Sequence, residues 1–131
     1  MDIFNKIKSI IMKKKTERDN LMDNKEYRNA RFEISKAYLE GTCDIDKDIS
    51  YGIELITNLA DKNHKDAQFF LAQCYERGDY IYKDPVMAHV YYNLCATSES
   101  KERLEELEKY MEGYEIREAR ARARVKYNFI K

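Results

Sequence analysis

The sequence contains no tryptophan, one proline and only four glycines in 131 residues. Scarce proline and glycine, together with plentiful lysine, glutamate, leucine and alanine, favour helices over strands, so we expect an almost purely helical protein. Lysine and arginine together number 24, as do aspartate and glutamate. This balance excludes the general basic excess typical of nucleic-acid-binding proteins, so an electrostatic partner must be recognised by a local patch.

Cysteine is also scarce, with Cys43, Cys74 and Cys95 widely spaced along the chain. An odd number without short paired spacing argues against a disulfide framework or a paired-cysteine metal site, and it suits a reducing compartment. No apolar run reaches the length of a membrane span, and the opening MDIFNKIKSIIMKKK interleaves lysines with its apolar residues, unlike a signal peptide. We therefore expect a cytoplasmic protein.

Two short stretches of the sequence resemble each other. Residues 30–41 read ARFEISKAYLEG, and residues 67–78 read AQFFLAQCYERG. The shared positions fall on one face of a helix in each copy. They are Ala30, Ile34, Ala37 and Tyr38 in the first copy and Ala67, Leu71, Cys74 and Tyr75 in the second, with Phe32 and Phe69 on one flank. We expect both faces to be buried and both helices to end at the glycine that follows, Gly41 or Gly78.

Each copy continues with a loop, a Lys-Asp pair and a second helix. Asp48 and Asp84 are suited to cap these second helices, and Pro85 suits a first helical position. Asp66 is expected to cap the helix that begins at Ala67. Because one helical hairpin cannot bury its own apolar face, a hairpin that recurs in register predicts a short α-solenoid, in which the second copy covers the first.

This succession of alanine, aromatic, aliphatic, small residue and Tyr-x-x-Gly, then an aliphatic residue, Lys-Asp and an alanine-bearing second helix, resembles the Sel-one-like repeats, relatives of the tetratricopeptide repeats. The tail from Met87 to Tyr127 resembles the closing segment of many bacterial members, with two further helices separated by a methionine-containing turn. Four positions depart from the family pattern, and the first loop is one residue longer than the second. Asp44 and Tyr80 stand where a loop glycine is usual, Gly52 stands where the second helix usually has alanine, and Leu55 stands where a large aromatic residue is usual.

The resemblance implies an all-α fold with two helix-turn-helix repeats, an N-terminal helix and two C-terminal capping helices. We expect a basic amphipathic segment at residues 1–27 and a single repeat domain at residues 28–127. The repeats are expected at about 30–66 and 67–98, and the capping helices at about 99–127. The N-terminal segment suits capping of its own stack, a partner helix or an anionic membrane surface, and capping is the simplest use.

No motif indicates chemistry. The sequence has no phosphate-binding glycine loop, nucleophile elbow or metal-ligand spacing, so we expect no enzyme, cofactor or metal. His64 is interpreted as a linker residue and His89 as a residue at a helix surface or edge. Cys74 and Cys95 occupy repeat positions and are interpreted as small core residues.

In this superfamily the first helix of each repeat lines a concave groove, which implies a partner-binding surface. Its residues are Glu33, Lys36 and Glu40 in the first copy and Phe70, Gln73 and Arg77 in the second. Phe70 replaces Glu33 outside the shared buried pattern, so it is either a binding hot spot or a residue packed under the final helices or the N-terminal segment. Tyr80 and Tyr82 in the second loop either extend the contact surface at the rim or pack within the loop.

The basic residues of the last helix suggest an alternative function. Arg117, Arg120 and Arg124 share one flank and suit contact with phosphates, although a solvated helix face is the simpler interpretation. The resemblance implies a protein-interaction module, acting as adaptor, scaffold or regulator, whose partner is a protein or peptide. Binding of nucleic acid or an anionic surface through the basic terminal helices is the alternative, and self-association remains open.

Overall fold

The computed structural model describes Ile3, Lys6, Ile7 and residues 24–130. The continuous part contains six helices and no strand, which confirms the predicted all-α class. The helices are α2 (Lys25–Glu40), α3 (Ile49–Asp61), α4 (Lys65–Arg77), α5 (Pro85–Cys95), α6 (Ser98–Glu108) and α7 (Gly113–Ile130). The segment REARARARVKY, which alternates with the period of a strand, is helical within α7 as its alanine and arginine content predicts.

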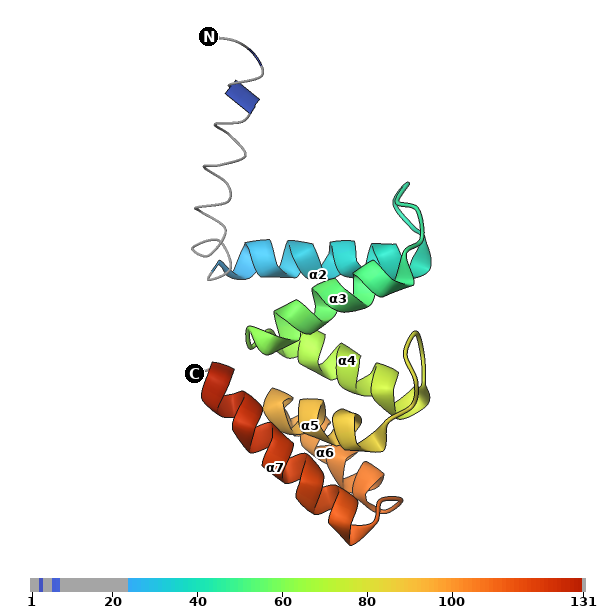
Figure 1. Ribbon diagram of the computed structural model, residues 1–131, viewed down its shortest axis with the longest axis vertical. Coiled ribbons are helices and arrows are strands. Elements are labelled where there is room, and N and C mark those ends of the chain that lie inside the picture. Colours follow the sequence, from blue (N-terminus) through green and yellow to red (C-terminus); the bar gives the residue numbers. More distant parts are fainter. Residues whose placement is uncertain (1–2, 4–5, 8–23, 131) are drawn as a thin grey trace.

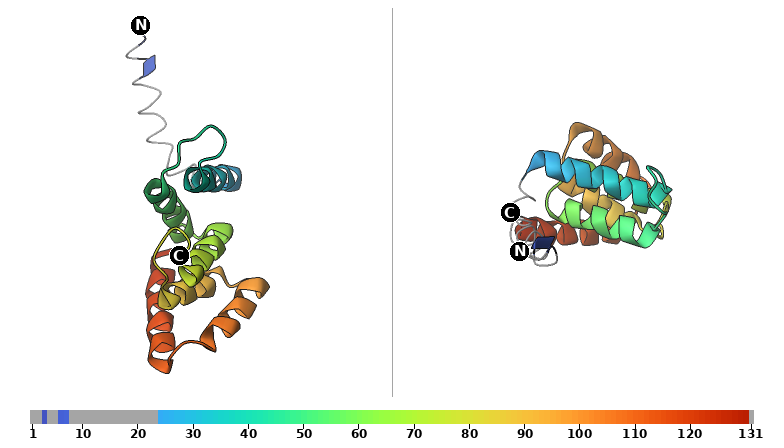
Figure 2. Two further views of the ribbon diagram at one scale, coloured as in Figure 1. Left: turned by 90° about the vertical axis from the view of Figure 1, so that its right-hand side faces the viewer. Right: turned by 90° about the horizontal axis from the view of Figure 1, so that it is seen from above.

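Consecutive helices form a stack of hairpins (Figure 1). Helix α2 packs against α3, α4 packs against both α3 and α5, and α5 also packs against α6 and α7. Seen from the side, α2, α4 and α6 lie along one side of the stack and α3 and α7 along the other (Figure 2). This arrangement confirms the predicted two-repeat solenoid closed by two C-terminal helices.

The helix ends follow local sequence signals. Asp48 and Asp84 cap α3 and α5 as predicted, and Gly41 and Gly78 end α2 and α4 with φ angles of 71° and 78°. The cap of α4 differs from the prediction, since it is His64 rather than Asp66. The chain enters the helix two residues earlier, so Asp66 lies in the first turn.

The core is asymmetric between the two repeats. In α4, Ala67 and Leu71 are fully buried, as predicted, because the preceding repeat covers them. The equivalent residues of α2 are exposed, with 46% of Ile34 accessible, so the prediction for Ala30 and Ile34 was wrong. Among the described helices, α2 packs extensively only against α3, so its outer flank has no helical neighbour. The predicted cap of residues 1–27 lies largely outside the described residues.

The first hairpin is unusually close at Gly52. A Cβ atom at this position would lie 2.8 Å from the Leu39 side chain and 3.0 Å from the Ser35 carbonyl oxygen. Leu39 and Ser35 are fully buried at this contact. The departure from alanine at Gly52 therefore permits a closer approach of α2 and α3 than a side chain would allow.

Candidate functional site

A hollow of about 540 Å³ opens on the side formed by the first helix of each hairpin. Helices α2 and α4 provide its aromatic wall, and the start of α6 closes it. We call it the α2/α4/α6 groove. Its lining residues are Phe32, Lys36, Lys65, Asp66, Phe69, Phe70, Gln73, Cys95, Thr97, Ser98 and Glu99.

Two phenylalanines dominate the groove. The rings of Phe32 and Phe70 meet edge-on, with centroids 5.9 Å apart and planes at 81°. Phe32 is buried, while Phe70 is half-buried. The Lys36 ammonium lies 4.7 Å from the centroid of the Phe32 ring and 3.0 Å from a carboxylate oxygen of Glu33. Phe70 therefore lines the groove and packs against Phe32 of the first repeat, whereas the sequence suggested packing under the final helices or the N-terminal segment. Its role as a binding hot spot stays a prediction.

The structure brings together part of the predicted groove set. Lys36, Phe70 and Gln73 line the hollow, and Glu33 joins it through its ion pair with Lys36. Glu40 and Arg77 lie beyond it, one helical turn further along α2 and α4 and exposed. Sequence reasoning assigned Phe32 and Phe69 only to the buried flank. The signal that could have placed them in the groove is that an aromatic residue occupies this flank in both copies.

His64 connects the two repeats behind the aromatic wall. Its Nδ1 accepts a hydrogen bond from the Ala67 N–H at 3.1 Å, so the proton of the neutral ring sits on Nε2, which donates to Asn29 Oδ1 at 2.8 Å. The imidazole also packs against Phe32, with ring centroids 5.3 Å apart. Burial lowers the pKa of His64, because it penalises the charged ring. His64 lies in the link between α3 and α4, as interpreted from the sequence, and it also caps α4 and packs against Phe32.

The other histidine is a core residue. His89 is fully buried, and its Nε2 lies 2.7 Å from Glu108 Oε1 at the end of α6. The interpretation of His89 as a surface or edge residue was wrong, because α6 and α7 both pack against α5 and enclose it. Sequence repetition could not reveal this, since among the described helices α3 packs extensively against α2 and α4 but has no counterpart of the contact between α5 and α7.

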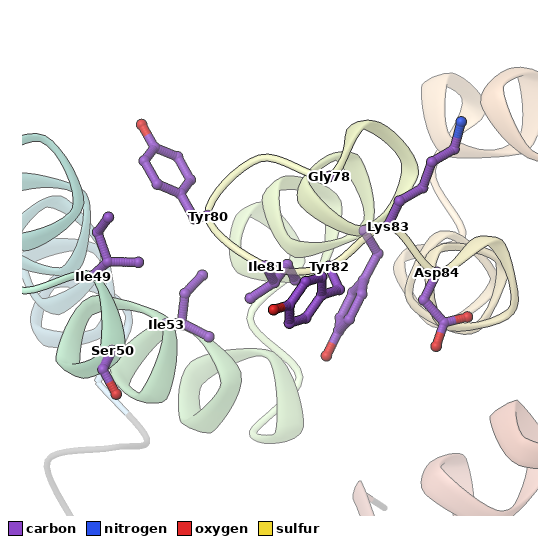
Figure 3. Close-up of a pocket in the computed structure, with 10 residues that line it drawn as sticks. Ile49, Ser50, Ile53, Gly78, Tyr80, Ile81, Tyr82, Lys83 and Asp84 are labelled. Carbon is purple, nitrogen blue, oxygen red and sulfur yellow. The ribbon is translucent and has the colours of Figure 1, made fainter.

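A second hollow, of about 1080 Å³, lies between α3 and the second loop (Figure 3). Ile49 and Ile53 of α3 face Ile81, Tyr80 and Tyr82 of the loop, and Ser50, Tyr75, Gly78, Lys83 and Asp84 complete the lining. The predicted rim tyrosines thus line a cavity of their own, not the α2/α4/α6 groove. Tyr82 is 96% exposed.

Tyr80 adopts a left-handed backbone conformation, with φ of 68°, and Asp44 in the first loop does the same, with φ of 59°. These are the two loop positions where Sel-one-like repeats usually have glycine. The chain therefore keeps the loop conformation and accepts the strain of a side chain there. Burial, together with the carboxylates of Glu40 and Asp79, raises the pKa of Tyr80.

Only part of the predicted phosphate-contact set of α7 lines a common hollow. Arg120 and Arg124 line a third hollow, of about 470 Å³, together with Lys65 of α4, whereas Arg117 does not. Arg122 pairs with Glu118, and Lys126 lies 3.2 Å from Asp61. The charge available to a long polyanion is therefore reduced by ion pairs within α7 and between α7 and α3.

The described part of the chain contains no group of three or more side chains arranged to hold a metal ion. No described helix is both long and apolar enough to cross a membrane. The described part of the chain consists of two repeated hairpins followed by two closing helices. The first helix of each hairpin ends in Tyr-x-x-Gly.

Comparison with protein families places a Sel1 repeat at residues 29–64 and another at residues 65–97. The chain belongs to the Sel1 repeat family. Sel1 repeats generally serve as protein–protein interaction modules rather than enzymes. A comparison with curated proteins gives no significant match.

The Sel1 fold is also seen in a solved structure, a protective antigen present in uropathogenic Escherichia coli strains that displays an SLR fold. The two chains are 20% identical and superpose with a TM-score of 0.69. The match covers 79% of this chain but only 23% of the antigen. At this level of identity the likeness concerns the fold alone.

Proposed function

We propose that this Sel1 repeat protein is an adaptor that binds a peptide or helix of a partner protein in the α2/α4/α6 groove, without chemistry. The observation that carries the proposal is the edge-on pair of Phe32 and Phe70 inside a hollow built by both repeats and the start of α6. The three cysteines of the protein are free, which suits a reducing compartment and supports the proposal that the protein acts in the cytoplasm.

The groove has the composition of a binding hot spot. Phe70 offers rigid apolar area, and Lys36 and Gln73 beside it are partly exposed hydrogen-bonding groups. Binding energy is usually concentrated in such central aromatic residues, surrounded by polar neighbours that exclude water. A partner side chain inserted against Phe70 would displace water from an already preorganised wall.

The contact extends beyond the hollow. Glu33, Lys36 and Glu40 follow one another on one face of α2, and Phe70, Gln73 and Arg77 repeat this spacing on α4. A stable interface buries about 1,600 Å² in total, more than one hollow supplies, so the partner follows these two rows toward the loops. The alternating acidic and basic groups of the α2 row, together with Arg77 on α4, would fix its register.

The test compares Phe70→Ala with Tyr110→Ala. Tyr110 follows α6, is 85% exposed and lies outside the groove and the second loop, so its variant controls for general loss of aromatic surface. Tagged protein is used to capture partners from host lysate with and without nuclease, and bound proteins are identified by mass spectrometry. We expect a discrete protein in both halves, lost with Phe70→Ala and kept with Tyr110→Ala, while both variants retain the helical circular dichroism signal.

Nucleic-acid binding through α7 predicts the opposite pattern. Capture would disappear after nuclease treatment, and affinity would fall steeply as salt rises, because neutralised phosphates release counterions. A partner that binds Phe70→Ala as well as the wild type would overturn the groove proposal. The pairing of Arg122 and Lys126 with acidic residues is the reason for favouring the groove.

A further inference from the structure

The hollow between α4, α5 and α7 is lined by three cationic side chains and no acidic one. We call it the Lys65 hollow. Its lining residues are Lys65, Asn93, Leu94, Ala96, Arg120, Ala123, Arg124 and Tyr127. They come from segments up to 62 positions apart, so the cluster is a product of the fold and was not visible as a motif. Its volume is about 470 Å³.

Lys65 holds one wall of the hollow. It is the first residue of α4, and its Nζ donates to the Leu94 carbonyl oxygen at 3.0 Å. This contact engages a carbonyl at the end of α5, where the helix dipole is negative. The start of α4 contributes the opposite, positive end of a dipole at the same place.

The two arginines differ in how they are paired. Arg120 Nη2 lies 3.4 Å from Glu108 Oε1, a long contact to an oxygen that also lies 2.7 Å from His89 Nε2. Within the described residues, Arg124 has no ion pair at all. Two guanidinium groups one helical turn apart therefore border the hollow, one weakly paired and one free to bind an anion.

We propose that the Lys65 hollow binds the phosphate group of a small phosphorylated molecule. Guanidinium groups donate pairs of hydrogen bonds in a geometry that matches phosphate oxygens, and an ammonium group adds a point charge. The amide of Asn93 is available for a further contact. This site is separate from partner binding in the groove, although Lys65 borders both hollows.

The distribution of unpaired cations around the hollow favours binding of one phosphate group over binding of a nucleic-acid backbone. A polyanion needs a row of free cations, but beyond the hollow Arg122 and Lys126 are paired with Glu118 and Asp61. Arg117, on the same flank of α7, lies outside the hollow. Three cations gathered at a hollow of this size suit a single dianionic group.

The test is an NMR titration of the full chain with inorganic phosphate at constant ionic strength, with sodium chloride as the reference salt. We expect saturable shifts in the amides around Lys65, Asn93 and Arg124. Arg124→Gln should weaken phosphate binding by about tenfold or more, since charge-assisted hydrogen bonds are lost. Arg117→Gln, a matched change on the same flank, should alter the affinity by less than about twofold, because a charge outside the hollow is screened by solvent. Phe70→Ala should leave it unchanged.

Three results would overturn the proposal. Shifts that do not saturate, or that chloride reproduces, would indicate only general screening of the surface. Equal losses in Arg124→Gln and Arg117→Gln would indicate a diffuse basic face. A parallel titration uses glycerol phosphate and vesicles containing phosphatidic acid, and binding to the vesicles alone would assign the cations to a membrane surface instead of a small molecule.

Discussion

The ring of Phe70 meets the ring of Phe32 edge-on, at 5.9 Å between centroids, so the second repeat touches the first inside the groove. The two residues differ in burial, since Phe32 is 8% exposed and Phe70 is half-buried. One pair thus combines a structural residue with a residue available to a partner. This difference makes their roles separable by mutation.

Phe32→Ala should lower the free energy of unfolding by about 3–5 kcal/mol, the usual cost of removing a buried phenylalanine. Phe70→Ala should cost only about 1–2 kcal/mol, mostly the aromatic pair and part of its apolar area. Urea denaturation followed by circular dichroism measures both. A cost for Phe70→Ala equal to that of Phe32→Ala would make Phe70 a core residue and would weaken the case for a binding role.

Gly52→Ala should destabilise the protein although alanine is the better helix former. The new Cβ would lie 3.0 Å from the Ser35 carbonyl oxygen, so backbone must move, and overpacking of this kind costs about 1–3 kcal/mol. Gly113→Ala is the matched control, because its Cβ meets only the flexible end of Arg117 at 3.4 Å. In thermal melts, Gly52→Ala should lower the melting temperature clearly more than Gly113→Ala does.

The sequence predicts the local features of the fold well. The positions and ends of the helices depend on neighbouring residues, so they could be identified from the chain alone. Examples are the capping aspartates Asp48 and Asp84 and the glycines that end α2 and α4. The exposure of Ile34 and the burial of His89 could not, because each depends on which helix covers that face in the folded stack.

The candidate sites were predictable only in part, for the same reason. Repeat equivalence identified Phe70 as unusual, and the structure shows that it lines a hollow. Equivalence could not show that Phe32 would face it, nor that Lys65 would meet Arg120 and Arg124. Contacts between distant segments depend on the angle and spacing of packed helices, which sequence spacing does not encode.

Stability should fall as pH is lowered through the titration of His64. Burial, with a smaller contribution from Arg28 and opposed by Asp66, lowers the pKa of the folded imidazole below its usual value near 6.5. The unfolded chain therefore takes up the proton first, so the stabilisation is complete above about pH 7 and is lost as pH falls. Protonation would also remove the Nδ1 acceptor that caps α4.

His64→Asn separates capping from titration, because asparagine is a good N-cap without a titratable ring. We expect lower stability at neutral pH, from the lost packing on Phe32, but a flatter dependence between about pH 7 and 5. His89 is present in both proteins, so the difference between their profiles isolates His64. Parallel profiles from chemical denaturation at several pH values would contradict the assignment.

Asp44 and Tyr80 share a left-handed conformation, and replacing each with glycine should give opposite results. Asp44 is exposed, so Asp44→Gly mainly relieves backbone strain and should raise the free energy of unfolding by about 0.5–1 kcal/mol. Tyr80→Gly relieves the same strain but removes a side chain that is only 39% exposed and that lines the hollow against Ile49 and Ile53. We expect a net loss of stability there, measured by urea denaturation. A gain for both variants would mean that Tyr80 contributes no packing, and its large side chain in a strained position would then have to be explained by contact with a partner.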